Sequence, residues 1–495
     1  MSIRERISTF FEFGARNTGH IGASRTSRAQ IMNGKSYGPN TVAINDQTLL
    51  KNRSRDGVRN FPYPKNAIRK LVSHEIGSGI KPKFKTGDEK IDAQLSELWE
   101  YSHRELVNGN DGNFYAGQRL CSRARNEAGE VFIRRRRRSP SNSDLTVPMQ
   151  VDILESDYLD ITDNRTLSNG NKVRSGIEFN RSGKRVAYHF YVEHPSESSL
   201  FGQGSGSGTR KTRILAKDVI HHYIPLRPGQ LRGLPINSAS LFKSANLEKY
   251  DDFELVRKQN QSSFSGTVER EARFLQDGRL ADPLTGQPYA EPEGEQPPKL
   301  KVGAGQFIHL GDGEKLNLFN GDKGGEFYAD YMRQALLSIS ADYGVMYELV
   351  TGDWKNTTDR LYRAAMDDFK REIEAIQELY MISQVCQKVE AWWMDAIVLA
   401  GAVALPDYAE NRRRYICNDW IPQGWPYMHP LQDAQAAEKL INNNLTTHSR
   451  EGRKHSVDTD RALVENVAHR KKKQDLEAAA GLSVEDEKDD KESDS

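Results

Sequence analysis

The sequence of 495 residues has few cysteines, almost no net charge and no long apolar run. Cys121, Cys386 and Cys417 stand alone without CxxC spacing, which argues against a disulfide framework or a zinc site and favours folding in a reducing cytoplasm. The longest apolar run, residues 396–405, is far shorter than the about 20 residues of a membrane-spanning helix. We therefore expect a buried helix there and no membrane partner. The charged N-terminus is too broken for a signal peptide.

Only 37% of the residues are hydrophobic, 28% are charged, and the mean hydropathy is −0.73. This composition predicts much polar surface, as on an elongated body or around a water-filled lumen. The length predicts two to four domains. The formal net charge of +1 gives no global field that attracts nucleic acid, so any DNA contact must be local or weak.

The first half of the chain passes from a polar arm through helices to strands. Residues 1–60 are rich in Gly, Asn and Arg and predict an arm with little core of its own. Apolar residues at helical spacing follow up to about residue 130. Short β-type runs, separated by turns at Asn169-Gly170 and Ser182-Gly183, then fill residues 130–225. The pattern predicts an α+β fold.

Two helical segments enclose a region of prolines and short strands. Residues 265–323 break the helical pattern and include a β-type run at 306–310. A helix is predicted on each side, over 236–264 and 326–343, and the first would be about 43 Å long. The first helix carries one apolar stripe: Ile236, Ala239, Phe242, Ala245, Tyr250, Phe253 and Val256. We predict a long helix that leaves the body, a β module at its tip and a returning helix.

Helical spacing dominates the last third of the chain. A long helix is predicted from Asp359 to Leu405, with a bend at Gly401 and an end at Pro406. Residues 415–437 set tryptophans and a tyrosine among prolines, which suits a segment that braces a large assembly.

Further helices are predicted over about 430–480. The acidic residues 486–495 are predicted to be disordered.

Two patterns are similar to known chemical motifs but lack their spacing. Gly34-Lys35-Ser36 is similar to the end of a phosphate loop, yet Ala29 replaces the required earlier glycine and no apolar strand precedes it. His189 and His194 have a spacing seen in zinc proteases, but they lie in a β-like segment, where residues five apart face opposite sides. We therefore expect no catalytic residue, no metal ligand and no cofactor.

Two further groups favour structural roles. His221 and His222 alternate across a predicted strand, so we expect one to be packed and the other exposed. Arg134 to Arg138 could hold phosphates, but no aromatic residues interleave with them. We favour a strand edge or loop kept soluble by charge, or pairing with acidic groups of a neighbouring subunit.

Carboxylates and one link remain as candidate sites. Glu248, Asp251, Asp252 and Glu254 lie on the polar face of the first long helix, and repeated around a ring they would form an acidic wall that repels phosphates. On sequence alone, the link between the long helices is an ordinary turn. Its central residues are Trp354, Lys355, Asn356, Thr357 and Thr358.

The chain resembles the lambda-type portal proteins of tailed bacteriophages over most of its length. The resemblance depends on the order and spacing of many short motifs. They include Arg53-Ser54-Arg55, Gly77-Ser78-Gly79-Ile80, Gly129-Glu130-Val131-Phe132, Glu155 to Asp160, Ala187 to Phe190, His194-Pro195, Arg227 to Gln230, Arg232-Gly233, Tyr347-Glu348-Leu349 and Asn418-Asp419-Trp420. One departure is His429, where the family pattern leads us to expect Asp before Pro430-Leu431, so the local helix cap is in doubt.

The resemblance implies a portal fold and a role for each region. Residues in the loop before the long helix would approach DNA, which reverses the preference for an ordinary turn. The implied regions are an N-terminal arm at 1–60, a mixed α/β wing at 61–235, a stem helix at 236–264, a small β-containing clip at 265–323, a returning stem helix at 324–344, a tunnel loop region at 345–358, a long kinked helix and wing at 359–429, and a helical crown with an acidic tail at 430–495.

The resemblance also implies a function without catalysis. Copies would form a ring, commonly of twelve subunits, at the portal vertex of the capsid in the virion, after assembly in the host cytoplasm. The ring would nucleate capsid assembly and give double-stranded DNA a non-specific passage. Its partners would be the terminase large subunit, a head-completion or tail adaptor protein, and the major capsid and scaffold proteins. Alternatives are a phage nucleic-acid-processing enzyme and a monomeric assembly adaptor.

Overall fold

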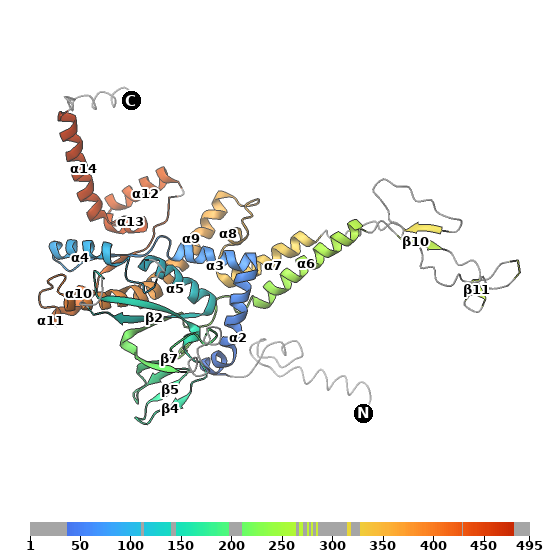
Figure 1. Ribbon diagram of the computed structural model, residues 1–495. Coiled ribbons are helices and arrows are strands. Elements are labelled where there is room, and N and C mark those ends of the chain that lie inside the picture. Colours follow the sequence, from blue (N-terminus) through green and yellow to red (C-terminus); the bar gives the residue numbers. More distant parts are fainter. Residues whose placement is uncertain are drawn as a thin grey trace, which may run out of the picture.

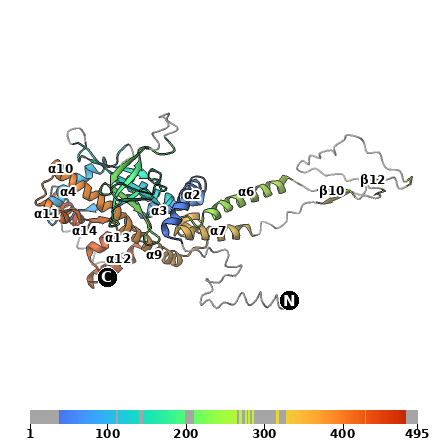
Figure 2. The same ribbon diagram turned by 90° about the horizontal axis from the view of Figure 1, so that it is seen from below.

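The computed structural model shows a molecule drawn out along one direction (Figure 1). A pair of helices leaves the body toward one end, and three C-terminal helices lie at the other end (Figures 1 and 2). The structure describes residues 37–109, 113–139, 145–197, 210–263, 267–270, 275–276, 279–280, 284–285, 314–317, 327–427 and 429–479. The predicted phosphate-loop remnant at 34–36 lies outside the described residues.

The N-terminal part of the body is helical. Its elements are α2 (Pro39–Asn60), α3 (Pro62–Glu75), β1 (Lys81–Lys83), α4 (Glu89–Ser102) and α5 (Phe114–Ala128). The prediction of an arm without a core is wrong for residues 39–60, because α2 packs into the body. Its buried face is mostly polar, with Gln47, Lys51 and Ser54 beside Ala43 and Val58, so no apolar periodicity indicated it.

Two antiparallel sheets follow, as the β-type pattern predicted. The three-stranded sheet has the order β3-β2-β9, and the five-stranded sheet has the order β4-β5-β6-β7-β8. Gly170 and Gly183 have a φ of 80° and lie in the turns between β4 and β5 and between β6 and β7, which confirms the predicted turns. The strands are β2 (Glu130–Arg137), β3 (Met149–Glu155), β4 (Arg165–Thr166), β5 (Lys172–Arg174), β6 (Ile177–Phe179), β7 (Arg185–Tyr191), β8 (Lys211–Leu215) and β9 (Val219–Tyr223).

Aromatic side chains join distant parts of the sequence in the main core. The ring of Trp99 on α4 lies 4.9 Å from that of Trp393 and 5.8 Å from that of Trp420, centroid to centroid, in edge-to-face contacts. Trp420 belongs to β14 (Asp419–Ile421), which pairs with β1. The Trp/Pro segment is therefore anchored in the N-terminal part of the body.

The projecting pair consists of α6 (Leu241–Ser263) and α7 (Tyr328–Tyr343). The 23 residues of α6 are about 35 Å long. The predicted start at residue 236 is wrong, because Asn237 and Ser240 instead bond to the end of α7. The Asn237 amide donates to the Tyr343 hydroxyl at 2.8 Å, and the Ser240 N–H donates to Asp342 at 2.7 Å. The root of the stem is thus fastened at both helices.

Short strands lie beyond the stem, in the region predicted as the clip. Strand β10 (Thr267–Arg270) pairs with β13 (Glu314–Asn317), and β11 (Leu275–Gln276) pairs with β12 (Arg279–Leu280). The predicted β run at 306–310 lies outside the described residues.

The predicted long helix is continuous from Asp359 but ends early. It comprises α9 (Asp359–Ile376), the π-helical segment η6 (Gln377–Cys386) and α10 (Gln387–Ala400). Gly401, at φ 66°, ends the helix rather than bending it, so the predicted bend and the end at Pro406 are wrong. The irregularity is the π-helical segment. Ala396 and Ile397 are buried as predicted, but Leu399 is 81% exposed.

The C-terminal part is helical, as predicted for the crown. After α11 (Tyr408–Ile416) and β14 come α12 (Pro430–Asn442), α13 (His448–Lys454) and α14 (Thr459–Ala479). His429 stands at the N-cap of α12 without a side-chain cap bond, and its N–H donates to Asp433 at 3.0 Å. The acidic tail lies outside the described residues. Within the described part, no helix has the length and apolarity to cross a membrane.

Gly129 lets the stem root lie against the junction of α5 and β2. It has a φ of 92°, and a Cβ there would lie 2.4 Å from the carbonyl carbon of Leu234. We expect Gly129→Ala to destabilise the fold by about 3 kcal/mol or more, since it adds a backbone clash to left-handed strain. The control Gly183→Ala has φ 80° but open space around it, and it should cost about 1 kcal/mol. Urea unfolding midpoints test this, and equal losses would contradict the packing argument.

Candidate functional site

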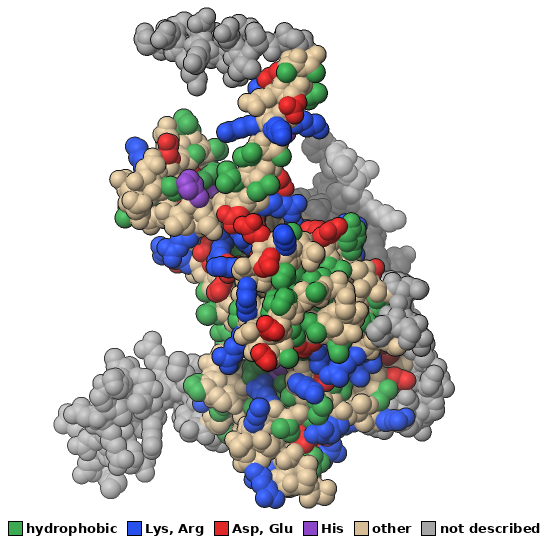
Figure 3. Space-filling view, turned by 90° about the vertical axis from the view of Figure 1, so that its left-hand side faces the viewer, with side chains coloured by type: hydrophobic (Ala, Val, Ile, Leu, Met, Phe, Trp, Pro, Cys, Tyr) green, Lys and Arg blue, Asp and Glu red, His purple; other side chains and the backbone are tan. Residues whose placement is uncertain are grey.

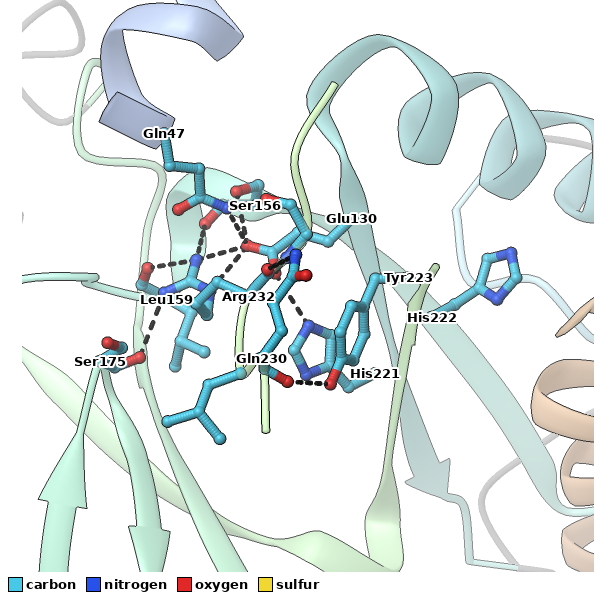
Figure 4. A network of polar contacts seen from close by, with 12 residues as sticks. Gln47, Glu130, Ser156, Leu159, Ser175, His221, His222, Tyr223, Gln230 and Arg232 are labelled. Carbon is cyan, nitrogen blue, oxygen red and sulfur yellow. Dashed lines mark hydrogen bonds and ion pairs between the residues drawn. The ribbon is translucent and has the colours of Figure 1, made fainter. Parts of the chain in front are cut away.

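A buried polar network joins both sheets, α2 and the segment that leads into the stem (Figure 4). Its centre is the ion pair between Glu130 on β2 and Arg232, both buried. The Arg232 Nε donates to the Glu130 carboxylate at 2.7 Å, and its two terminal nitrogens donate to the carbonyls of Ser175 and Leu159, each at 3.1 Å. One guanidinium thus fixes the ends of several segments.

The other donors to Glu130 come from α2 and from the stem lead-in. The Gln47 amide donates to Glu130 at 2.9 Å and to the Gly233 carbonyl at 2.8 Å, and the Gly233 N–H donates to Glu130 at 3.0 Å. Burial alone would raise the pKa of Glu130, but Arg232 and His221 more than offset it, and the pKa lies well below its usual range. Glu130 is therefore a charged structural anchor.

His221 and His222 are both buried, so the prediction that one would be exposed is wrong. His221 Nε2 donates to Glu130 at 2.9 Å on one side of β9. On the other side, His222 Nδ1 donates to Gln384 of η6 at 3.0 Å and its Nε2 accepts from Arg125 at 3.3 Å. Burial lowers the pKa of His221 to about 4 and that of His222 to about 3, so both are neutral at pH 7.

The arginine tract pairs with acidic groups of the same chain. Arg135 and Arg137 bond to Asp218, and Arg136 bonds to Asp152. The tract lies on β2, which is the central strand of its sheet. Its pairing with β9 ends at Arg134, so Arg135 to Arg137 have a strand neighbour only in β3 and lie at a strand edge, as predicted. For these three residues, the ion pairs leave no free phosphate-binding surface. The structural interpretation holds, but through pairing within one subunit.

A group of Glu155, Asp157 and His194 places three possible metal ligands within 4.8 Å of one another. Two cations already lie there: Lys51 bonds to Asp157 at 2.8 Å, and Arg55 lies 2.8 Å from Glu155 and 2.7 Å from Asp157. Two positive charges balance two carboxylates, so this is an ion-pair cluster. His189 lies elsewhere, 3.2 Å from Glu178.

A buried carboxyl holds the Trp/Pro segment to α10. Glu390 accepts hydrogen bonds from the Asn418 amide and from Trp420 Nε1, the latter at 2.7 Å. Burial raises its pKa to about 7, although the two donors act in the opposite direction. These two hydrogen bonds give Glu390 a structural role, since they connect α10 to β14 and the residue before it.

The four predicted stem carboxylates do not share one exposed face. Asp251 and Asp252 are exposed and Glu248 is half-buried, whereas Glu254 is buried and bonds to Arg257 at 2.8 Å. Asp251 also accepts from the hydroxyl of Tyr328 on α7. Partial burial and the charges of Asp251 and Asp252 raise the pKa of Glu248, so these three carboxylates act on one another.

The apolar stripe predicted for α6 divides between two sides. Leu247 is buried against α7, and the ring of Tyr250 lies 4.6 Å from that of Tyr331. Phe242, Phe253 and Val256 lie on another side and are 69%, 72% and 49% exposed. We call these three residues the outer stem face. Among the described residues, the guanidinium of Arg53 on α2 lies 5.0 Å from the Phe242 ring and leaves most of that side chain exposed.

The loop before α9 is exposed and held by short-range contacts. It follows α8 (Tyr347–Thr351) and Gly352. Trp354 is 46% exposed and contacts the ring of Tyr362 edge-on at 5.4 Å. Among the described residues, the side chains of Lys355 and Asn356 form no hydrogen bond and no ion pair. Thr357 is half-buried, and Thr358 caps α9 by accepting from the Leu361 N–H at 3.4 Å.

A groove of about 600 Å³ lies between α9 with η6 and the C-terminal helices. Trp425, Pro426 and Tyr427 line it together with acidic and basic side chains of α9 and α13. None of its described lining residues is Ser, Thr or Cys. Its described lining therefore offers no serine, threonine or cysteine nucleophile.

The comparisons with known proteins agree on one family. The profile of the family described as "Phage portal protein, lambda family" matches residues 25–377. The chain is 26% identical to the "Probable portal protein" of Halomonas phage phiHAP-1 over 409 residues, which cover 81% of this chain and 76% of that protein. It is 23% identical to "Portal protein B" of Escherichia phage lambda over 477 residues, which cover 88% and 86%.

Solved structures give weaker similarity. A chain from the "Neck of empty GTA particle computed with C6 symmetry" matches with a TM-score of 0.46 and 14% identity, over 81% of this chain and 91% of that one. A chain from the "Virion of native gene transfer agent (GTA) particle" matches with a TM-score of 0.45 and 13% identity, over 86% and 95%.

The buried His222 should make folding sensitive to acid. The unfolded chain protonates this histidine near the ordinary pKa of 6.5, whereas the folded chain does so only near about 3. Its contribution is thus fully present above pH 6.5 and is lost as the pH falls from 6.5 toward 3. In His222→Gln, the free energy of unfolding should fall less steeply as the pH is lowered, by at most about 1.4 kcal/mol per pH unit.

Thermal unfolding between pH 7.5 and 4.5 measures this difference. The control His448→Gln, at an exposed position of α13, should keep the wild-type profile. If the thermal stability of His222→Gln depends on pH as that of the wild type does, His222 is not the source of the acid sensitivity.

Proposed function

The chain belongs to the lambda family of phage portal proteins, and we propose that its copies close into a ring through which double-stranded DNA passes at one capsid vertex. The family is structural, not enzymatic. Twelve copies, assembly in the host cytoplasm and a place at the portal vertex of the virion are part of this proposal.

The observation that carries the proposal is the outer stem face. Phe242, Phe253 and Val256 are exposed on a helix whose opposite side already packs on α7. Burying such side chains is worth about 1.5–3 kcal/mol each, so a single copy leaves a favourable contact unmade. If this face meets a different patch on the next copy, the contact is head-to-tail, and such contacts form a ring when the rotation between copies closes.

Weak contact with DNA is consistent with the charges of the stem. Glu248, Asp251 and Asp252 form a cluster of carboxylates on α6, and repeated around a ring they would repel phosphates. Glu254 drops out of the proposed acidic surface because Arg257 neutralises it. DNA would then slide past without specific binding.

The exposed loop of residues 353–358 is the proposed tunnel loop. It lies between two packed helices, α8 and α9, so a rigid base presents a short, exposed segment. Lys355 gives it one positive charge, suited to a transient phosphate contact.

We also propose the partners implied by family membership. The clip, including β10 to β13, would meet the terminase large subunit during packaging and a head-completion or tail adaptor protein later. The major capsid protein and a scaffold protein would meet the ring during assembly.

The enzyme alternative has less support. Asp251 and Asp252 lie on an exposed helix, and Asp251 already bonds to Tyr328, so they lack the pocket that metal-dependent chemistry needs. A monomeric adaptor would not need the outer stem face at all.

Phe253→Asp should reduce ring formation without unfolding the subunit. The side chain is exposed in one copy, so a carboxylate there is harmless until a neighbour has to cover it. We expect mass photometry to show mainly single copies, with an unchanged far-UV circular dichroism spectrum. The control Arg181→Gln changes the net charge equally at an exposed turn and should keep the wild-type assembly. Normal rings from Phe253→Asp would contradict the proposed interface.

Lys355→Ala should leave rings intact and impair DNA packaging or retention. The residue is exposed and makes no side-chain bond in the described structure, so its loss removes a phosphate contact but no packing. DNA protected from nuclease inside particles measures the effect. Lys90→Ala, an exposed lysine on α4, is the matched control. If Lys355→Ala abolishes rings instead, the loop is a packing element.

A further inference from the structure

The helix α14 projects from the body and is held mainly at its base (Figure 1). None of its residues is buried. Lys83 of β1 fastens the base by ion pairs to Asp458 at 2.6 Å and Asp460 at 2.7 Å. The rest of the helix therefore contributes little to the core of its own subunit, and its side chains are available to another molecule.

Five consecutive side chains in the middle of α14 form what we call the basic band: His469, Arg470, Lys471, Lys472 and Lys473. All five are exposed. Because successive helical residues turn by about 100°, five of them surround the helix rather than forming one face. Figure 3 shows Lys and Arg side chains gathered across this helix.

The basic band differs from an ordinary solvated helix surface. Such surfaces alternate in charge, as Arg461 and Glu465 do at 2.8 Å in the first half of α14. No acidic residue lies between Glu465 and Asp475. Arg470, Lys471 and Lys472 form no ion pair with any residue that the structure describes. Lys473 pairs with Glu477 at 3.6 Å, so the uncompensated charge of the band lies on Arg470, Lys471 and Lys472.

The arginine tract of β2 differs from the basic band. Arg135, Arg136 and Arg137 are bonded to Asp218 and Asp152, so carboxylates of the same subunit neutralise much of their charge. The tract on β2 and the run on α14 therefore differ in how much of their charge is free. The described side chains of Arg470, Lys471 and Lys472 can meet an external polyanion.

We propose that the basic band binds the phosphate backbone of duplex DNA at the end of the molecule away from the stem tip. The choice of duplex DNA as the polyanion depends on the proposed function. Lysine and arginine contacts to phosphates carry no sequence information, so the binding is independent of sequence and sensitive to salt. It supplies a local attraction that the net charge of +1 does not.

A membrane surface fits the basic band less well. A helix that lies in a membrane interface has an apolar face along its length, opposite a basic face. On α14, the exposed Leu463, Val464 and Val467 precede the basic band and Leu476 follows it, so they form no apolar face opposite the band. Because the basic side chains surround the helix, phosphates can approach them from any side.

The test compares DNA affinity by fluorescence anisotropy with a labelled 30-base-pair duplex at several salt concentrations. R470Q/K471Q/K472Q should bind about tenfold more weakly at 0.1 M salt, and its salt slope should be lower by about 2–3, since each phosphate contact contributes about 0.9. The matched control K172Q/R174Q/K184Q removes three exposed cations from the five-stranded sheet and its turn, and should stay within about twofold of wild type.

Two further measurements make every outcome decisive. R470K/K471R/K472R keeps the charge and should bind like wild type, which separates charge from folding; weak binding by this variant overturns the proposal. Equal losses in the two neutralised variants overturn it too, as does no loss in R470Q/K471Q/K472Q. If that variant loses only binding to phosphatidylserine vesicles, the occupant is a membrane and the proposal fails.

The native mass of each variant shows whether rings form, independently of whether the basic band binds DNA. Rings with unaltered DNA affinity in R470Q/K471Q/K472Q would overturn the basic band and leave the ring standing. Single copies of the wild-type chain would overturn the ring, while the affinity comparison would still decide the role of the band.

Discussion

The architecture depends on an apolar surface that one subunit cannot cover. Helix α6 uses one side to pack on α7, through Leu247 and Tyr250, and leaves Phe242, Phe253 and Val256 exposed on another. Each of these side chains would contribute about 1.5–3 kcal/mol if a neighbour buried it, against the entropy cost of association. This exposed surface is the basis for the proposal that the chain works within an assembly.

The root of that stem is held by buried charge as well as by apolar packing. Arg232 and Gly233 lead into α6, and both are tied to Glu130 within the body. A buried ion pair is weak evidence for added stability, but its fixed geometry selects one arrangement over others. The close approach of Leu234 to Gly129 has the same effect. The direction in which the stem leaves the body is therefore defined by a few polar atoms.

The sequence predicted elements whose signals are local. Alternation and Asn-Gly or Ser-Gly turns identified the strands between 130 and 225, and helical spacing identified both stem helices. It failed where burial is polar. Helix α2 buries Gln47, Lys51 and Ser54, which leave no apolar period, and Gln47 and Lys51 pair with groups that are distant in sequence. The π-helical segment at 377–386 likewise has no local signature.

The candidate sites were likewise predicted correctly where the signal is local and wrongly where contacts distant in sequence decide. Alternation placed His221 and His222 on opposite sides of β9, but exposure was predicted wrongly because both sides of that sheet are covered, by the five-stranded sheet and by α5 with η6. The partners of the arginine tract, Asp218 and Asp152, also lie beyond local reach. The tunnel loop came from the family resemblance and the acidic stem surface from the charge pattern of the first long helix, and both remain proposals.

Single-particle electron cryomicroscopy of the purified chain tests the central claim most directly. The account predicts closed rings with a central opening, in which the face of α6 formed by Phe242, Phe253 and Val256 is covered by the adjacent copy. Isolated, well-folded subunits at high concentration, or rings in which that face stays open to solvent, would contradict it.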